Sequence, residues 1–132
     1  MAAGLLQKLA NDKKLAVEVQ SAGLAAFPGV PPTPEAVEAS KEKGFDLSGH
    51  QSQPLGKNLV MESDVILTMT GKHKEMILKK MPALAEKVQM LSEWAGVGAE
   101  DIDDPVGQPL DVYRKVLGQI EGYLLKSLGH LN

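Results

Sequence analysis

The sequence contains no cysteine. A chain without cysteine forms no disulfide, offers no thiolate ligand to a metal and has no sulfur nucleophile. Its three histidines do not have the convergent spacing of a metal site. We therefore expect neither a metal nor another cofactor in this chain.

Long apolar runs and an excess of basic residues are absent as well. No apolar run approaches the roughly 20 residues that span a bilayer. The opening MAAGLLQKLANDKK is not typical of a signal peptide, because Gln7 and Lys8 interrupt its apolar residues and no basic segment precedes them. The formal net charge is −3, whereas a nucleic-acid surface is usually strongly basic. We expect a cytoplasmic protein that binds neither membrane nor nucleic acid.

What is present suits one globular domain over residues 1–132, since 43% of the residues are hydrophobic. Helical spacing of apolar residues, with capping signals at several ends, predicts five helices. Thr33-Pro34 supplies an N-cap and a proline at the first helical position, and Gly44 supplies a stop. The predicted helices span 1–12, 34–44, 54–62, 71–80 and 109–128.

Three segments predict strands. Residues 15–20 alternate apolar and polar side chains, which is typical of a half-exposed strand at a sheet edge. Residues 65–69 and 88–91 are apolar runs that suit buried parallel strands. Helices and strands alternate along the chain, which predicts an α/β fold with a parallel sheet and helices on both faces. Such a fold normally begins with a strand, so we expect a segment to be missing before Met1.

An ordered series of short motifs resembles the low-molecular-weight protein phosphatases. No single motif is specific, but their order and spacing across the whole chain are. Asp101 to Gly107, with Asp111 and Tyr113 after it, favours the bacterial branch that includes protein-arginine phosphatases. The motifs are Met1-Ala2-Ala3-Gly4-Leu5-Leu6, Ser21-Ala22-Gly23, Thr33-Pro34-Glu35-Ala36-Val37, Asp46-Leu47-Ser48-Gly49-His50, Met61-Glu62-Ser63-Asp64, Val65-Ile66-Leu67-Thr68-Met69-Thr70, His73-Lys74 and Asp104-Pro105.

The resemblance implies a flavodoxin-like, doubly wound parallel sheet and hydrolysis of phosphorylated protein side chains. In that family a cysteine thiolate forms a phosphocysteine, and an aspartic acid protonates the leaving group. The cysteine lies in a Cys-x5-Arg-Ser/Thr loop between the first strand and the first helix, where helix N–H groups bind phosphate. This strand and loop are missing from the sequence, so we expect an N-terminally truncated domain that is inactive as given.

By the same resemblance, Asp104 is the general acid and base, and Ser21 supports the phosphate loop through a hydrogen bond. The structural alternatives are a turn aspartate before proline and a serine that satisfies local backbone. Val106 follows Asp-Pro where relatives usually have an aromatic residue. Asp101 and Asp103 are expected to be solvated loop acids.

The remaining unusual side chains are expected to be structural. We expect Trp94 to pack over the sheet edge and His73 to be at least half-buried on its helix. His50 is expected to make a structural hydrogen bond. The lysines at 72, 74, 79 and 80 indicate a solvated helix face, with recognition of a phosphoprotein as the alternative.

Three functions remain open at this point. The first is a protein phosphatase acting on phosphotyrosine or phosphoarginine, with a phosphorylated protein as partner. The second is a binding or regulatory domain of the same fold without catalysis. The third is a thiol-based arsenate reductase, which ranks last because that chemistry needs several cysteines and the sequence has none. Oligomeric state is not readable from the sequence.

Overall fold

The computed structural model describes residues 1–22, 29, 31–49 and 53–131. The predicted loop residues 23–28 and 30, and His50, lie outside this part of the chain. The elements, in order, are α1 (Ala2–Asp12), α2 (Pro34–Glu42), α3 (Lys57–Glu62), β1 (Ile66–Thr68), α4 (Gly71–Lys80), the 3-10 turn η1 (Pro82–Leu84), β2 (Val88–Met90), α5 (Leu91–Trp94), α6 (Leu110–Ser127) and the 3-10 turn η2 (Leu128–Leu131).

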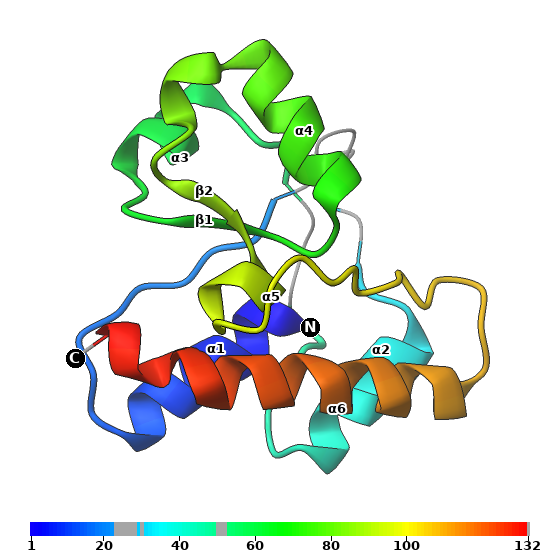
Figure 1. Cartoon of the computed structure of the whole chain (residues 1–132). Coiled ribbons are helices and arrows are strands. Elements are labelled where there is room, and N and C mark those ends of the chain that lie inside the picture. Colours follow the sequence, from blue (N-terminus) through cyan, green and yellow to red (C-terminus); the bar gives the residue numbers. More distant parts are fainter. Residues whose placement is uncertain (23–28, 30, 50–52, 132) are drawn as a thin grey trace.

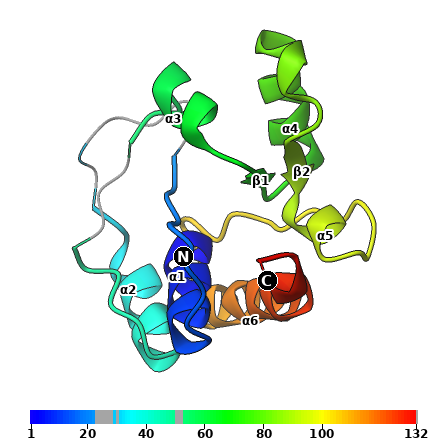
Figure 2. The ribbon, with the colours of Figure 1, turned by 90° about the vertical axis from the view of Figure 1, so that its left-hand side faces the viewer.

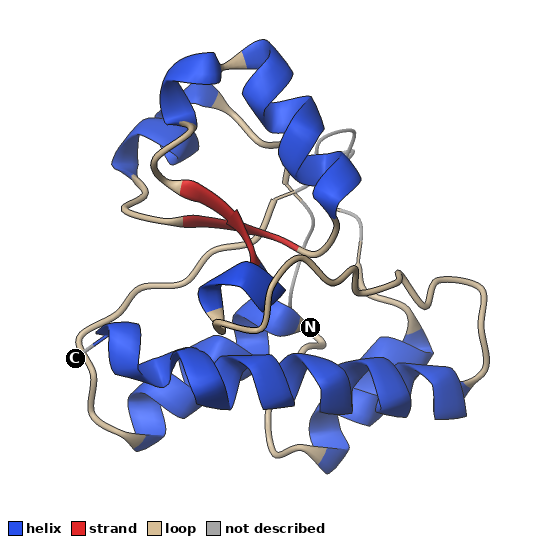
Figure 3. Ribbon diagram, viewed as in Figure 1, coloured by secondary structure: helices blue, strands red, loops and turns tan. Residues whose placement is uncertain are grey.

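The described part of the chain forms two layers with a small sheet between them. β1 and β2 are parallel, and Ile66 is paired with Val88. Figure 1 and Figure 3 show the two strands below α3 and α4 and above α5, α1 and α6. The predicted α/β class with a parallel sheet is confirmed.

α6 is the helix that organises the lower layer, and it packs against α1, α2 and α5. Its buried face carries an apolar stripe at helical spacing, which explains why these residues form one long helix. The stripe contains Tyr113, Val116, Leu117, Ile120, Tyr123 and Leu124. The predicted helix is confirmed, although Gly129 does not end it directly, because η2 continues the coil through that position.

α2 begins and ends as its sequence predicts. The Thr33 hydroxyl accepts a hydrogen bond from the Ala36 amide at 3.3 Å, and Pro34 occupies the first helical position. Gly44 follows the helix with a φ of +89°, a left-handed conformation that glycine adopts without strain. Thr33 also donates to the hydroxyl of the buried Tyr113 at 3.0 Å, which ties this cap to α6.

The prediction of a strand at residues 15–20 is wrong. The alternation is real, since Leu15, Val17 and Val19 are half-buried and the residues between them are exposed, but no strand is formed there. The side-chain amide of Gln7 on α1 donates to the Val17 carbonyl at 2.9 Å and accepts from the Val19 amide at 2.9 Å. One glutamine side chain thus binds two backbone groups that a neighbouring parallel strand would bind.

The other differences concern the ends of elements. The helix predicted at 54–62 begins only at Lys57, because Gly56 is its extended N-cap. The strand predicted at 88–91 ends at Met90, since Leu91 begins the short helix α5, which the sequence did not predict. The Glu93 carboxylate bonds back to the Met90 amide at 2.9 Å, and this contact turns the chain directly from strand to helix.

Candidate active site

The amino end of α1 is an uncapped helix terminus in the middle of the molecule. The Leu5 amide donates to the Met1 carbonyl at 3.0 Å, so the N–H groups of Ala2, Ala3 and Gly4 precede the first intrahelical bond. Within the described residues no side chain caps this end, and its first turn carries no acidic residue. Free N–H groups and the helix dipole favour an anion at such a place.

Asp104 lies within electrostatic reach of this helix end. Burial lowers the pKa of the Met1 amino group, and the negative charge of Asp104 acts in the opposite direction. In both ribbon views the loop between α5 and α6, which carries Asp104, passes the amino end of α1 (Figure 1, Figure 2). The structure therefore brings together Asp104 and the helix end at which the sequence analysis places a phosphate group.

The backbone around Asp104 fixes its direction. Its carboxylate accepts a hydrogen bond from the Val106 amide at 3.0 Å, and this closes a small turn over Pro105. Pro105 is buried, and a following proline keeps the Asp104 backbone extended. Asp104 itself is exposed. A carboxyl group held in this way remains accessible to a molecule that binds at the end of α1.

The residues just before Asp104 anchor its loop to the carboxyl end of β1. The Ile102 amide donates to the Met69 carbonyl at 2.8 Å, and the Ile102 side chain is only 2% exposed. One residue earlier, the Asp101 carboxylate accepts from the Gly71 amide at 2.9 Å. Asp101 is an exposed loop acid, as expected, and its carboxylate also binds the first turn of α4. Asp103 is exposed, as expected.

A further contact joins this loop to the lower layer. The Glu100 amide donates to the Ser92 hydroxyl at 2.9 Å, and the Tyr123 hydroxyl on α6 donates to the Glu100 carboxylate at 2.7 Å. The hydrogen bond to this carboxylate raises the pKa of Tyr123. The segment 100–104 is thus held from β1, α4, α5 and α6.

Ser21 lies on another side of α1. Its carbonyl accepts a hydrogen bond from the Gln53 side chain at 2.8 Å. It shares a cavity of about 410 Å³ with Gly4 and Gln7 of α1, and Ala3, Val19, Gln20, Asp46, Leu47, Gly49 and Gln53 also line that cavity. Ser21 is therefore close to the first turn of α1.

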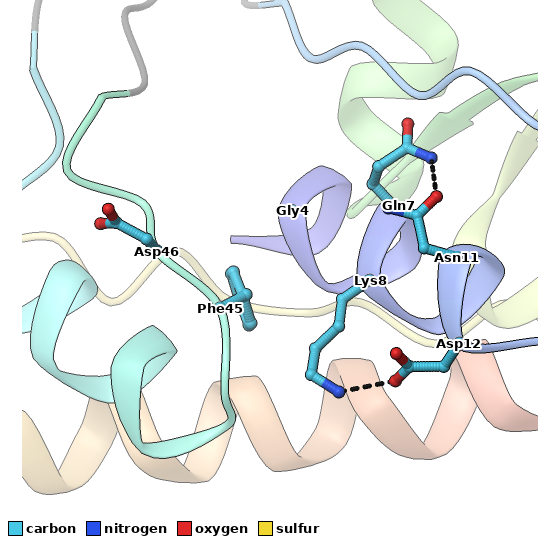
Figure 4. Close-up of a pocket in the computed structure, with 7 residues that line it drawn as sticks. All are labelled: Gly4, Gln7, Lys8, Asn11, Asp12, Phe45 and Asp46. Carbon is cyan, nitrogen blue, oxygen red and sulfur yellow. Dashed lines mark hydrogen bonds and ion pairs between the residues drawn. The ribbon is translucent and has the colours of Figure 1, made fainter.

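A second cavity, of about 350 Å³, lies along the outer side of α1 (Figure 4). The Lys8 ammonium and the Asp12 carboxylate form an ion pair of 2.7 Å, and Gln7 bonds Asn11 at 3.1 Å. Phe45 covers Gly4 so closely that a Cβ there would come within 2.8 Å of its ring. Neither Asp104 nor Ser21 lines this groove, and its polar side chains already have hydrogen-bond or ion-pair partners, so we assign it no role in catalysis.

The remaining candidates have structural places. Trp94 is buried and stacks on His130 with ring centroids 5.4 Å apart. His73 is exposed, so the expectation of a half-buried ring is wrong. On α4 the buried face consists of Ile77. Residues 1–22, 29, 31–49 and 53–131 contain no histidine and carboxylate group that could hold a metal ion. They also contain no helix long and apolar enough to cross a membrane.

Two residues that hold the segments around this site carry no recognisable signal in the sequence. Gln7 holds residues 17–19, and Asp101 holds the loop of Asp104. The partner of Asp101 lies 30 residues away in the chain, so no local pattern points to it. Gln7 occupies the polar side of an amphipathic helix, where glutamine is usually a solvent-facing residue.

Comparison with known proteins assigns the family. The family model for low molecular weight phosphotyrosine protein phosphatases matches residues 1–132. A protein-arginine-phosphatase of Bacillus subtilis is 36% identical over 124 residues, which cover 94% of this chain and 82% of the relative. The chain therefore belongs to the low molecular weight protein phosphatase family.

Relatives within this family carry two kinds of name. A probable low molecular weight protein-tyrosine-phosphatase of Ralstonia nicotianae is 35% identical over 89% of this chain and 79% of its own length. Among solved structures, a cysteine-to-serine mutant of the arginine phosphatase YwlE, with a phosphorylated active-site serine, is 35% identical. It matches with a TM-score of 0.93 over 98% of this chain and 85% of that one. The flavodoxin-like phosphatase fold is confirmed.

Proposed function

We propose that this chain is a phosphatase-like domain that contributes the general acid to hydrolysis of phosphorylated tyrosine or arginine side chains in proteins. The observation that carries the proposal is that the loop of Asp104 passes the uncapped amino end of α1 (Figure 1, Figure 2). A substrate phosphate bound by the free N–H groups there would present its leaving atom to this carboxyl group.

The chemistry assigns Asp104 two tasks. In the first step a thiolate attacks phosphorus, the S–P bond forms, the bond from phosphorus to the leaving atom breaks, and Asp104 gives its proton to that atom. In the second step a water attacks phosphorus, Asp104 takes a proton from the water, and the S–P bond breaks. Residues 1–132 contain no cysteine, so the thiolate has to come from outside them.

Ser21 is proposed to support the loop that carries the thiolate. Its position beside Ala3 and Gly4, in a cavity of about 410 Å³, supports this role, because a loop leading into α1 would pass there. A hydroxyl donor beside such a loop helps to hold its backbone N–H groups toward the phosphate oxygens.

The names of the relatives and one local feature support the proposed substrate class. Their names divide between arginine and tyrosine phosphatases. Val106, next to the turn of Asp104, is 65% exposed and offers an aliphatic surface beside the acid. An aliphatic contact can accept the methylene chain of phosphoarginine and provides no aromatic stacking for phosphotyrosine.

The test is hydrolysis of p-nitrophenyl phosphate by two forms of the protein. One is the 132-residue chain, and the other carries an added strand and Cys-x5-Arg loop before Met1. We expect turnover only in the loop-bearing form, with a loss of about a hundredfold or more in Asp104→Ala. Turnover by the cysteine-free chain would refute the mechanism. Comparing kcat/KM for phosphotyrosine and phosphoarginine peptides then assigns the substrate.

A binding domain of the same fold without catalysis is the second candidate. This function predicts that the 132-residue chain binds a phosphopeptide in a titration, while the loop-bearing form does not turn it over. Arsenate reduction ranks third, because that chemistry needs several cysteines and residues 1–132 contain none.

A further inference from the structure

The loop that carries Asp104 is attached to the rest of the molecule two and three residues before Asp104, at Ile102 and Asp101. Ile102 and Asp104 are separated by two peptide links, each about 3.8 Å between Cα atoms. If the attachment point moves, the carboxyl group of Asp104 therefore moves by nearly the same distance. The attachment point consists of the Ile102–Met69 and Asp101–Gly71 hydrogen bonds.

The turn from β1 into α4, to which Asp101 binds, is itself held by two hydrogen bonds. The Thr68 hydroxyl donates to the Thr70 carbonyl at 3.0 Å, and the Thr70 hydroxyl accepts from the His73 amide at 3.2 Å. These two bonds brace the turn from β1 into α4. The Asp101 carboxylate accepts from the Gly71 amide in the same turn, so it connects the acid loop to the braced turn between β1 and α4.

We propose that Asp101 is a positioning residue that holds Asp104 in line with the amino end of α1 by binding the first turn of α4. The proposal rests on the proposed function, because it assumes that Asp104 is the general acid. Asp101 does not touch the substrate. It acts by fixing the acid loop, whereas Asp103, the exposed acid between Ile102 and Asp104, has no such task.

Two substitutions break the same contact from opposite sides. Asp101→Ala removes the acceptor. Gly71→Pro removes the donor and leaves α4 intact, because proline is favoured at the first helical position and Thr70 already has the extended backbone that precedes proline. A Cβ at Gly71 would meet its neighbours at 3.6 Å or more, which is ordinary contact. Asp103→Ala is the matched control, and Asp101→Asn is the conservative variant, since its amide oxygen still accepts.

The experiment compares kcat/KM for phenyl phosphate and p-nitrophenyl phosphate in the loop-bearing form. Phenolate is the poorer leaving group, so its release depends more on a well-placed acid. We expect Asp101→Ala and Gly71→Pro each to lower the phenyl to p-nitrophenyl ratio by about tenfold, since misplacement by ~1 Å costs up to ~10²-fold. Asp101→Asn should recover part of the ratio, and Asp103→Ala should leave it unchanged.

Thermal unfolding of the 132-residue chain separates positioning from stability. Asp101→Ala should lower Tm, because α4 loses a cap, and Gly71→Pro should not. If Asp101→Ala lowers the phenyl to p-nitrophenyl ratio and Gly71→Pro does not, the effect comes from destabilisation of α4, and the proposal is overturned. It is also overturned if Asp103→Ala matches Asp101→Ala. If Asp104→Ala leaves the ratio unchanged, Asp104 is not the acid and the proposed function itself fails.

Discussion

The molecule has two regions that are packed very differently. The helical layer consists of α1, α2 and α6, with α5 and the acid loop against it, and the strand lobe consists of residues 57–90. Among the described residues, the buried apolar cluster of the helical layer has fifteen members and that of the strand lobe has four. The lobe cluster contains Val60, Ile77, Leu84 and Val88.

This difference concerns the site directly, because the site lies between the two regions. The amino end of α1 belongs to the helical layer, while the loop of Asp104 is bonded to Met69 and Gly71 of the strand lobe. Small clusters with few buried contacts open at lower free energy than large ones. The position of Asp104 therefore depends on the region with the smaller buried cluster.

The largest effect is expected from a cavity in the helical layer. Leu117 on α6 is 1% exposed at the centre of the larger cluster. Leu117→Ala should lower the free energy of unfolding by about 3 kcal/mol, since a buried leucine loses its transfer energy and leaves a cavity. Urea unfolding followed by circular dichroism measures it. A loss below about 1 kcal/mol would show that this layer does not carry the stability assigned to it.

A smaller and more local effect is expected in the strand lobe. Val60→Ala removes two buried methyl groups from the four-residue cluster and should cost about 2 kcal/mol. Hydrogen exchange should accelerate at the Ile66 amide, which donates to the Lys87 carbonyl at 2.7 Å, and much less at the amides of α6. Equal acceleration in both places would mean that the two regions open together and do not differ in local stability.

The sequence anticipates elements that carry local signals better than elements that depend on a distant partner. The α6 stripe and the Thr33-Pro34 cap are local signals, and both are confirmed. Residues 15–20 show why strands are harder. Their alternation predicts the buried side correctly, but it says nothing of a partner, and the partner here is the side chain of Gln7.

The site could be predicted only in part for the same reason. Asp104 stands out through a motif with its own neighbours, Pro105 and the residues before it. The contact that anchors its loop has no such motif, because the hydrogen bond between Asp101 and Gly71 joins segments 30 residues apart. The short helix α5 was missed because it depends on one carboxylate, that of Glu93, bonding back to the end of β2. Contacts between distant segments leave no periodic trace in a sequence.

Gly4 tests how tightly the helical layer is packed. An added Cβ would lie 2.8 Å from the Phe45 ring, so Gly4→Ala should lower the free energy of unfolding by about 1 kcal/mol despite the better helix propensity of alanine. Gly118 on α6 is the control, because nothing lies within 4 Å of its Cβ position. Gly118→Ala should therefore raise stability by about 0.5–1 kcal/mol. Thermal unfolding of both variants decides the sign, and equal gains would show that Phe45 simply moves aside.

The smallest effect is expected at an ion pair that joins α4 of the strand lobe to α5. The Lys74 ammonium lies 2.9 Å from the Glu93 carboxylate, and both side chains are partly exposed. The hydrogen bond from Lys74 lowers the pKa of Glu93, with a further contribution from the Met90 amide. A carboxyl group with a lowered pKa in the folded state stabilises the fold above its unfolded value of about 4.3. This contribution is lost as the pH falls through the folded value.

Glu93→Gln should therefore cost less than about 1 kcal/mol at pH 7, since an exposed pair contributes little. The difference from the parent chain should shrink as the pH falls through the folded pKa of Glu93, because protonation removes the same charge. Urea midpoints from pH 7 down to pH 3 measure it, with Glu86→Gln at an exposed position as the control. A difference that stays constant with pH would mean that Glu93 joins the two regions through packing and not through its charge.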